Sequence, residues 1–226
     1  MSNSKDISNI QKKTCAVIPF YNEEENLHKV LSETSKYVHF IFAVDDGSND
    51  NWRKNQLFLE SIKYISLGKN YGKGKALRIG FEEAISSGYE NIITLDADFQ
   101  HDPKLIPDML DGLKKNDFVI GNRLYDLKSM PVQRRMSNRL TSFILSKKTN
   151  QKILDSQCGF RAYSSKLLQS VKTSYNGFEA ESEIIVKATR KGFKIRFVDI
   201  PTIYGTEKSK MKALKAIIGF IKVMFI

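Results

Sequence analysis

Residues 91–102 read NIITLDADFQHD, and this stretch decides the fold. The apolar run at 92–95 is typical of a buried strand, and the polar residues after it are typical of a turn. Asp102 and Pro103 then supply two signals that begin a helix, a capping side chain and a proline in the first turn. A strand that runs through a polar turn into a helix is the repeating unit of an α/β protein.

The same alternation extends in both directions from this stretch. We expect Pro19 to end the first strand, and residues 122–133 carry loop character. Short strands between helices favour one domain with a mainly parallel sheet flanked by helices. The predicted strands are 14–18, 40–45, 62–66, 91–95, 117–120 and 194–200, and the predicted helices are 23–36, 51–60, 73–87, 103–114, 134–148 and 179–191.

The composition limits the classes of partner. The chain has 226 residues, 41% of them hydrophobic, and a formal net charge of +11. This charge predicts a polyanionic partner, which could be nucleic acid, an anionic membrane or a phosphorylated substrate. Two cysteines, Cys15 and Cys158, are too few for a disulfide framework, and the three histidines lack zinc-binding spacing. No apolar run approaches the ~20 residues of a membrane span, and the polar first residues do not resemble a secretory signal.

Three predicted strands end in polar clusters, at 19–23 (PFYNE), 45–48 (DDGS) and 96–100 (DADFQ). In open parallel sheets, ligands bind beyond the carboxyl ends of the strands, so we expect the clusters to face one site. Carboxylates gathered there repel one another unless a cation lies between them. Magnesium typically takes one or two carboxylates together with phosphate oxygens, so a metal-bound diphosphate suits this site.

Asp96 and Asp98 form a DxD motif. We expect this segment to be extended, in which case period-two alternation puts both side chains, and then that of Gln100, on one side. The same pattern also fits a capped turn after a strand, where Asp is common. Asp45 and Asp46 at another strand end favour the metal site.

Seven segments in this order closely resemble family 2 of the GT-A glycosyltransferases, and in particular the polyprenyl-phosphate glycosyltransferases typified by dolichol-phosphate mannose synthase. They are VIPFYNEEENL (17–27), VDDGSND (44–50), NYGKGKALRIGF (70–81), LDADFQHDP (95–103), GNR (121–123), DSQCGFRAY (155–163) and GFEAESEI (177–184). The resemblance implies a Rossmann-like GT-A sheet and a metal-dependent, inverting hexosyltransferase. It would move mannose or glucose from a GDP- or UDP-sugar to a membrane polyprenyl or dolichyl phosphate.

The resemblance also implies a donor site. Asp46 corresponds to the carboxylate that reads the base and Lys73 to a lysine near the donor. Mg²⁺ or Mn²⁺ would be held by Asp96, Asp98 and Gln100, with Asp98 acting directly in catalysis. The donor-binding residues are Pro19, Tyr21, Glu23, Asp46, Lys73, Asp96, Ala97, Asp98 and Gln100.

For the acceptor phosphate the resemblance implies Arg123 and the basic segment at 134–139. The planar guanidinium of arginine holds phosphate bidentately. The family often has Arg followed four residues later by Ser, whereas here Arg134 is followed by Asn138, so either Arg134 or Arg135 can take this role. The predicted catalytic and acceptor-phosphate residues are Arg123, Arg134, Arg135, Ser137, Asn138, Lys208 and Lys210.

Two further segments resemble the family. The loop 155–163 corresponds to one beneath the sugar and acceptor, with Cys158 replacing a small residue. Glu179, Glu181 and Glu183 suggest a general base, but an acceptor phosphate is largely ionised near pH 7 and needs no strong base. We therefore expect structural or sugar-contacting roles for these glutamates.

The C-terminal segment has the pattern of an amphipathic basic helix. Its apolar stripe either packs on the core or lies on anionic lipid with lysines at the headgroups. We expect a flexible N-terminus at 1–13, a catalytic domain at 14–203, and a juxtamembrane loop and interfacial helix at 204–226. The stripe is Met211, Leu214, Ile218, Ile221 and Phe225, and the lysines are Lys208, Lys212, Lys215 and Lys222.

These features predict a cytoplasmic protein bound peripherally to the cytoplasmic face of a membrane, with a possible membrane-anchoring subunit. Three other functions compete with this interpretation. A family 2 enzyme that acts on a hydroxyl acceptor, as in envelope polysaccharide synthesis, would need a true base. Nucleic acid binding is disfavoured by the acidic strand ends and the lack of a recognised reader motif. A lipid-phosphate-binding pseudo-enzyme is disfavoured by the intact DxD motif.

Overall fold

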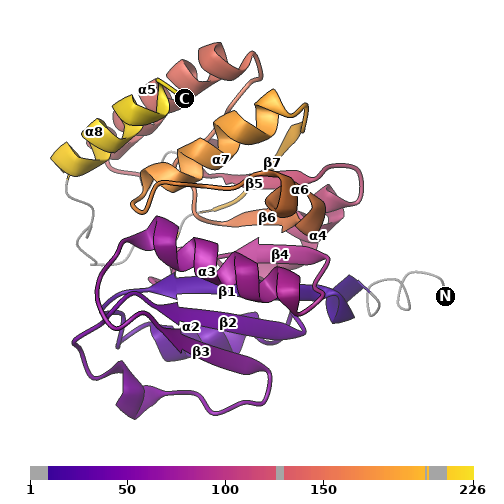
Figure 1. Ribbon diagram of the computed structural model, residues 1–226, viewed down its shortest axis with the longest axis vertical. Coiled ribbons are helices and arrows are strands. Elements are labelled where there is room, and N and C mark those ends of the chain that lie inside the picture. Colours follow the sequence, from indigo (N-terminus) through magenta and orange to yellow (C-terminus); the bar gives the residue numbers. More distant parts are fainter. Residues whose placement is uncertain (1–9, 126–129, 202, 204–212) are drawn as a thin grey trace.

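The computed structural model describes residues 10–125, 130–201, 203 and 213–226. In this part of the chain, seven strands form one sheet in the order β3-β2-β1-β4-β6-β5-β7 (Figure 1). The strands are β1 Thr14–Phe20, β2 Phe40–Asp45, β3 Ile62–Ser66, β4 Asn91–Thr94, β5 Phe118–Asn122, β6 Arg161–Ser164 and β7 Ile195–Asp199. All pairings are parallel except those of β6, which runs antiparallel to both β4 and β5. The predicted mainly parallel α/β sheet is confirmed.

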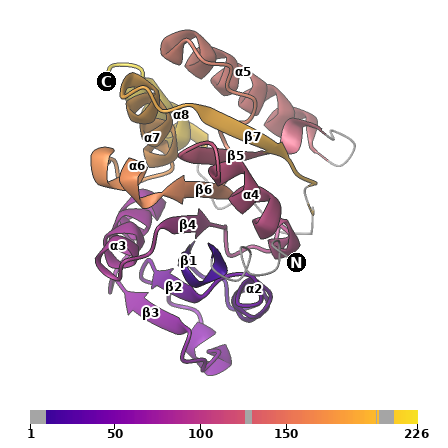
Figure 2. The same ribbon diagram turned by 90° about the vertical axis from the view of Figure 1, so that its right-hand side faces the viewer.

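Helices cover both faces of the sheet (Figure 2). On one face α3 packs on β1 and β2, with α6 and α7 beside it, and on the other α4 packs on β5, β6 and β7. The helices are α2 Leu27–Thr34, α3 Lys73–Ser86, α4 Ile106–Leu113, α5 Val132–Thr149, α6 Ser165–Ser170, α7 Glu179–Arg190 and α8 Ala213–Val223. Short 3₁₀ turns are η1 Trp52–Asn55, η2 Pro103–Leu105 and η3 Arg123–Tyr125.

The prediction that Pro19 ends the first strand is wrong, because β1 continues to Phe20. The carbonyl of Phe20 accepts a hydrogen bond from Asp46 N on the β2 side. Alternation turns the backbone of position 19 towards the β4 side, where pairing stops at Val17. Proline, which has no N–H to donate, therefore costs no ladder hydrogen bond there.

The predicted helix at 51–60 is also wrong, since only η1 forms there. Trp52 is buried against the rings of Phe20 and Tyr64. The Tyr64 hydroxyl bonds both the N–H and the carbonyl of Leu57 and holds the chain away from helical geometry. Long-range aromatic packing has outweighed local helical periodicity.

Other boundaries differ less. The helix expected from residue 23 begins at Leu27, and the one expected from 103 begins with η2 before α4. Asp102 caps η2 as predicted, with its side chain accepting from Lys104 N at 3.0 Å. Strand β6 and helix α6 were not predicted, because a four-residue strand inside a polar segment carries no clear alternation.

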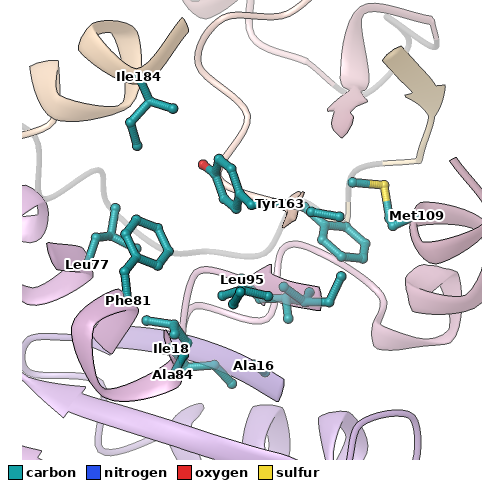
Figure 3. Close-up of a cluster of buried hydrophobic side chains, with 14 of the residues drawn as sticks. Ala16, Ile18, Leu77, Phe81, Ala84, Leu95, Met109, Tyr163 and Ile184 are labelled. Atoms are coloured by element: carbon teal, nitrogen blue, oxygen red, sulfur yellow. The ribbon is translucent and has the colours of Figure 1, made fainter. Parts of the chain in front are cut away.

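Packing on the face of the sheet that α3 covers joins its two halves. Tyr163 of β6 stacks on Phe118 at a ring distance of 4.8 Å and meets Phe81 of α3 edge-on at 5.4 Å. Figure 3 shows Tyr163 among the buried side chains of this cluster, together with Phe81 and Leu95. A Cβ on Gly80 would overlap Val17, so this glycine lets α3 lie directly on β1.

Candidate active site

The loops that follow β1 and β2 are joined by hydrogen bonds. Asn22 N donates to Ser48 Oγ at 2.9 Å, and Asn49 N donates to the Asn22 side chain at 2.9 Å. Glu24 N donates to Asp50 at 2.9 Å. Two of the three predicted polar clusters therefore meet at the carboxyl edge of the sheet, as parallel topology requires.

Asp45 and Asp46 have different surroundings. The buried Asp45 accepts from Ser48 N at 2.7 Å and from Ser66 Oγ at 3.0 Å, so it holds the turn after β2. Asp46 accepts from the backbone N–H groups of Tyr71 and Gly72, both at 2.8 Å. Burial raises the pKa of Asp46, while these two hydrogen bonds act against the shift. The carboxylate predicted to read a base thus also fixes the loop that leads into α3.

Lys73, the first residue of α3, lies between two carboxylates. Its Nζ is 2.6 Å from Asp96 Oδ1 and 2.9 Å from Glu181 Oε2. Burial disfavours the ammonium charge, but the two carboxylates outweigh it and raise the pKa of Lys73 above the ordinary lysine value. Burial likewise disfavours the charge on Asp96, yet Lys73 beside it lowers the pKa of Asp96 to about 2. The structure therefore joins the predicted donor-site lysine to the first aspartate of the DxD motif.

The expectation that residues 96–100 are extended is wrong. Phe99 has a left-handed φ of +57°, and Asp98 Oδ1 accepts from Gln100 N at 3.1 Å, which closes a tight turn. Period-two alternation therefore does not place Asp98 and Gln100. Burial raises the pKa of Asp98 to about 6, and the negative charges of Asp96 and Glu23 add to this effect. Asp98 forms no ion pair with any residue that the structure describes.

The oxygens at the DxD turn suit a hard divalent cation. Within the described residues, no three His, Cys, Asp or Glu side chains form a group that could hold a metal. Diphosphate oxygens would therefore have to complete the coordination around Asp96, Asp98 and Gln100. A cation beside Asp98 would offset the repulsion from Asp96 and Glu23 that raises its pKa. The residues present thus fit a metal that arrives with a diphosphate.

His101 and Gly159 also border Asp96, and the sequence analysis missed both. His101 is buried, with Nε2 4.0 Å from Asp96 Oδ2, and burial lowers its pKa to about 4, so it is neutral near pH 7. A Cβ on Gly159 would overlap the Asp96 carboxylate, so glycine is required for this approach. The 155–163 segment lies against the DxD motif, although its residues from Arg161 onwards form β6 rather than a loop.

Arg123, which follows β5, is held by the fully buried Asp155. Its Nε and Nη2 donate to the two carboxylate oxygens at 2.9 and 3.0 Å. Asn138 of α5 donates to the same carboxylate at 2.6 Å. Burial opposes the charge on Asp155, but Arg123 more than compensates and lowers its pKa. Asn138 is itself buried, so this predicted acceptor-phosphate residue has its amide directed at Asp155. No sequence signal pointed to Asp155 as their shared partner.

The remaining predicted acceptor residues lie near the start of α5. Arg134 and Arg135 are half-buried because they precede the inward-facing Asn138 by one helical turn. Arg135 donates to Met130 O at 3.5 Å, whereas Arg134 has no hydrogen-bond or ion-pair partner in the described part of the chain. Ser137 is exposed and accepts from Gln157 at 3.3 Å. Lys208 and Lys210 lie outside the described residues.

Helices α5 and α8 lie at one end of the molecule, far from β3 (Figure 1), and both carry exposed apolar side chains. Lys148 of α5 donates to Met224 O, just after α8, at 2.8 Å and joins the two. In α8, Gly219 and Val223 are buried against the protein, so the Ile218, Ile221 and Phe225 part of the predicted stripe faces outwards. We call this set the apolar end surface: Val132, Met136, Leu140 and Phe143 of α5, and Ile217, Ile218, Ile221 and Phe225 of the C-terminal segment, each at least 47% exposed.

None of the described helices combines the length and apolar character needed to cross a bilayer. The predicted stripe residues Met211 and Leu214, and the predicted lysines Lys212 and Lys215, have side chains outside the described part. Lys222 is exposed beside the apolar end surface, rather than on a separate face of the helix as expected.

Comparison with known proteins agrees with this geometry. A model of the family described as glycosyl transferase family 2 matches residues 15–172. A UDP-N-acetylglucosamine–dolichyl-phosphate N-acetylglucosaminyltransferase of Methanococcus voltae is 30% identical to this chain. The alignment covers 90% of this chain and 90% of that protein. A dolichol-phosphate mannosyltransferase of Pyrococcus furiosus is 28% identical over 93% of this chain and 62% of that protein.

Among solved structures, glucosyl-3-phosphoglycerate synthase of Mycobacterium tuberculosis, in complex with Mn²⁺, UDP and phosphoglyceric acid, superposes with a TM-score of 0.74. The two sequences are 18% identical, and the superposition covers 97% of this chain and 83% of the synthase chain. At this identity the similarity shows the fold alone. The chain therefore belongs to glycosyl transferase family 2 and has the GT-A fold. The predicted family and fold are confirmed.

Proposed function

We propose that this protein transfers a sugar from a nucleoside-diphosphate donor to a membrane polyprenyl phosphate. One observation carries the proposal: at the carboxyl edge of the sheet, Asp96 of the DxD motif pairs with Lys73 at 2.6 Å and is also acted on by the positive charge of Arg123. Such a site can hold a metal-bound diphosphate and, next to it, a second anion. The relatives from M. voltae and P. furiosus are named for transfer to dolichyl or dolichol phosphate, which supports this substrate class.

The donor half would bind the diphosphate. Asp96, Asp98 and Gln100 would hold Mg²⁺ or Mn²⁺, which neutralises the departing diphosphate. Pro19, Tyr21 and Glu23 lie at the end of β1, which hydrogen bonds join to the β2 loop, and Asp46 anchors the loop before α3. These residues would border the nucleoside. The likeness to a fold crystallised with Mn²⁺ and UDP supports this arrangement. Mannose and glucose stay the expected sugars, and GDP and UDP the expected carriers.

The acceptor half would orient the attacking phosphate. Arg123 keeps a fixed position because Asp155 holds two of its nitrogens. An acceptor phosphate oxygen forms a bond to the anomeric carbon while the bond from that carbon to the leaving diphosphate breaks, which inverts the centre. Because this oxygen is already ionised near pH 7, positioning and charge neutralisation suffice.

Two of the three glutamates of α7, Glu181 and Glu183, are held by other groups. Glu181 is paired with Lys73, and Glu183 accepts from Ser174 and Tyr175 and pairs with Lys187 at 2.7 Å. Neither carboxylate is free to remove a proton from an acceptor. A hydroxyl acceptor needs such a base, and of the three glutamates this leaves Glu179, which accepts from Gly177 N at 3.3 Å.

We further propose that the apolar end surface rests on the membrane that carries the acceptor. Exposed apolar side chains along two helices, with Arg139, Lys147 and Lys222 exposed near them, suit an interfacial position on anionic lipid. Placement on the cytoplasmic face and a membrane-anchoring subunit stay predictions.

A transfer assay tests the function. The purified protein is incubated with Mn²⁺, a short polyprenyl phosphate in detergent and each of a panel of GDP- and UDP-sugars. We expect a polyprenyl phosphate sugar from at least one donor, and no product from the matching polyprenol, which lacks the phosphate. Transfer to the polyprenol or to a soluble glycan, with none to the phosphate, would contradict the proposed acceptor.

A further inference from the structure

Glu181, in the first turn of α7, links Lys73 to a buried arginine. One carboxylate oxygen, Oε2, lies 2.9 Å from Lys73 Nζ. The other, Oε1, lies 3.6 Å from Arg161 Nε and has no hydrogen-bond partner within the described residues. Arg161 is fully buried, and its three nitrogens donate to the carbonyls of Cys158, Glu181 and Ser156 at 2.7 to 2.9 Å. Arg161 is therefore a fixed cation beneath Glu181.

These contacts form a chain of alternating charge from β6 through α7 and α3 to the end of β4. The order is Arg161, Glu181, Lys73 and Asp96, two cations and two carboxylates. The chain is neutral as a whole, and Lys73 is shared between its two carboxylates. Asp98 lies next to Asp96 but outside the chain, so a cation that binds both aspartates has to compete with Lys73 for Asp96.

Close packing fixes the distance between Lys73 and Glu181. A Cβ on Gly74 would overlap Ala180 Cβ and Gly177 O, so the start of α3 lies directly against the start of α7. Lys75 N also donates to Asn176 O at 3.2 Å. Because the two helix starts cannot separate without losing these contacts, Glu181 stays within reach of Lys73 whatever Asp96 binds.

We propose that Glu181 is a positioning residue that holds Lys73 while Asp96 exchanges the ammonium for the metal-bound diphosphate. This inference rests on the proposed function. An ammonium left without a partner in a buried site is costly. When Asp96 binds the metal and its ion pair with Lys73 is lost, Lys73 still has Glu181 as a partner. Without the Glu181 charge, Lys73 depends on Asp96 alone and resists the exchange.

Glu181→Gln tests the proposal because it keeps the shape of the side chain and removes its charge. Calorimetry measures the affinity for UDP and for GDP in EDTA and again with Mn²⁺, and the ratio of the two affinities is the metal enhancement. We expect the variant to lower this enhancement about tenfold, because Lys73 then competes harder for Asp96. In EDTA we expect binding that is unchanged or up to about threefold tighter, because a negative charge is lost. A merely structural defect would weaken binding in both conditions.

Glu183→Gln is the matched control. Glu183 is a buried carboxylate on the same helix, but its partners are Ser174, Tyr175 and Lys187. We expect this variant to lower the melting temperature and to leave the metal enhancement within about twofold of wild type. Glu181→Asp keeps the negative charge but, with a shorter side chain, places it farther from Lys73. The metal enhancement of this variant should therefore fall only about threefold.

The outcomes separate this proposal from the proposed function. A wild-type protein that binds neither nucleoside diphosphate with Mn²⁺ overturns both. A metal enhancement in Glu181→Gln equal to that of wild type overturns only the role of Glu181. If Glu181→Gln does not fold, Glu181→Asp decides, and an unchanged enhancement in that variant overturns the role equally.

Discussion

The two halves of the site use charge in opposite ways. In the donor half, formed by the ends of β1, β2 and β4, the predicted acidic residues are carboxylates, and Lys73 supplies the balancing cation for one of them, Asp96. In the acceptor half, formed by the end of β5 and by α5, the predicted charged residues are arginines, and the buried Asp155 supplies the balancing anion for Arg123. Each half therefore uses one buried counter-charge to order a group of the opposite sign.

The two halves also differ in the sign of the charged side chain that has no ionic partner among the described residues. In the donor half, Asp96 is paired and Asp46 holds backbone amides, while Asp98 has no ionic partner among the described residues. In the acceptor half Arg123 is paired, while Arg134 has no partner in the same part of the chain. The pairing suggests that Asp98 meets a cation and Arg134 an anion, and the predictions below test this division from the largest expected effect to the smallest.

The first prediction concerns the unpaired carboxylate. Asp98→Ala should lower the rate of sugar transfer by at least about 10³-fold, because the charge of the departing diphosphate is no longer offset through the metal. Its melting temperature should stay close to that of wild type, since within the described residues Asp98 makes only a local turn hydrogen bond. The transfer assay with Mn²⁺ measures the loss, and Asp111→Ala, an exposed carboxylate paired with Lys114, is the control. Near-normal turnover would remove Asp98 from the metal site.

The second prediction concerns the buried counter-charge of the acceptor half. Asp155→Ala should destabilise the protein by about 3 kcal/mol or more, because it leaves Arg123 and Asn138 without their shared acceptor. Urea unfolding followed by circular dichroism measures the change. Asp117→Ala is the control, since the Asp117 side chain accepts only from Ser164 Oγ, and it should cost about 1 kcal/mol. Equal stability of the two variants would contradict the structural role of Asp155.

The third prediction separates the two adjacent arginines. Arg134→Ala should raise the KM for polyprenyl phosphate about 30-fold, with the KM for the sugar nucleotide unchanged, because a charged hydrogen bond to the acceptor is lost. Arg135→Ala should change the acceptor KM less than about threefold, since Arg135 already bonds Met130 O. Steady-state kinetics with each substrate varied in turn gives both values. The reverse order would assign the acceptor phosphate to Arg135.

The smallest expected effect concerns the apolar end surface. Phe143→Ser should weaken binding to anionic vesicles about tenfold, the loss expected when one large apolar side chain no longer enters the lipid. Vesicle co-sedimentation measures the affinity. Phe58→Ser is the control, because Phe58 is 82% exposed but precedes β3 at the other end of the molecule. Equal loss in the two variants would show that general surface hydrophobicity, rather than α5, binds the lipid.

Much of the fold could be predicted from local patterns. Strands β2 and β3 have the predicted bounds, and α3 ends one residue early. The polar clusters after β1 and β2 meet because parallel strands end at one edge. Two local predictions failed, one because of contacts from distant strands and one because of a side chain within the turn itself. Trp52 is held by aromatic rings from β1 and β3, and the turn at Phe99 is closed by the Asp98 side chain rather than continued as a strand.

The sequence by itself determined the class of fold, the family and the residue types that gather at the strand ends, because these depend on periodicity and on ordered motifs. The tertiary structure alone decided which charges are paired. Lys73 and Glu181 are 108 positions apart, and Arg123 and Asp155 are 32 apart. No pattern of neighbours encodes such pairs, because an ion pair depends on distance in space and on the burial that strengthens it. The same holds for the stripe of α8, whose outward direction was set by the packing of Gly219 and Val223.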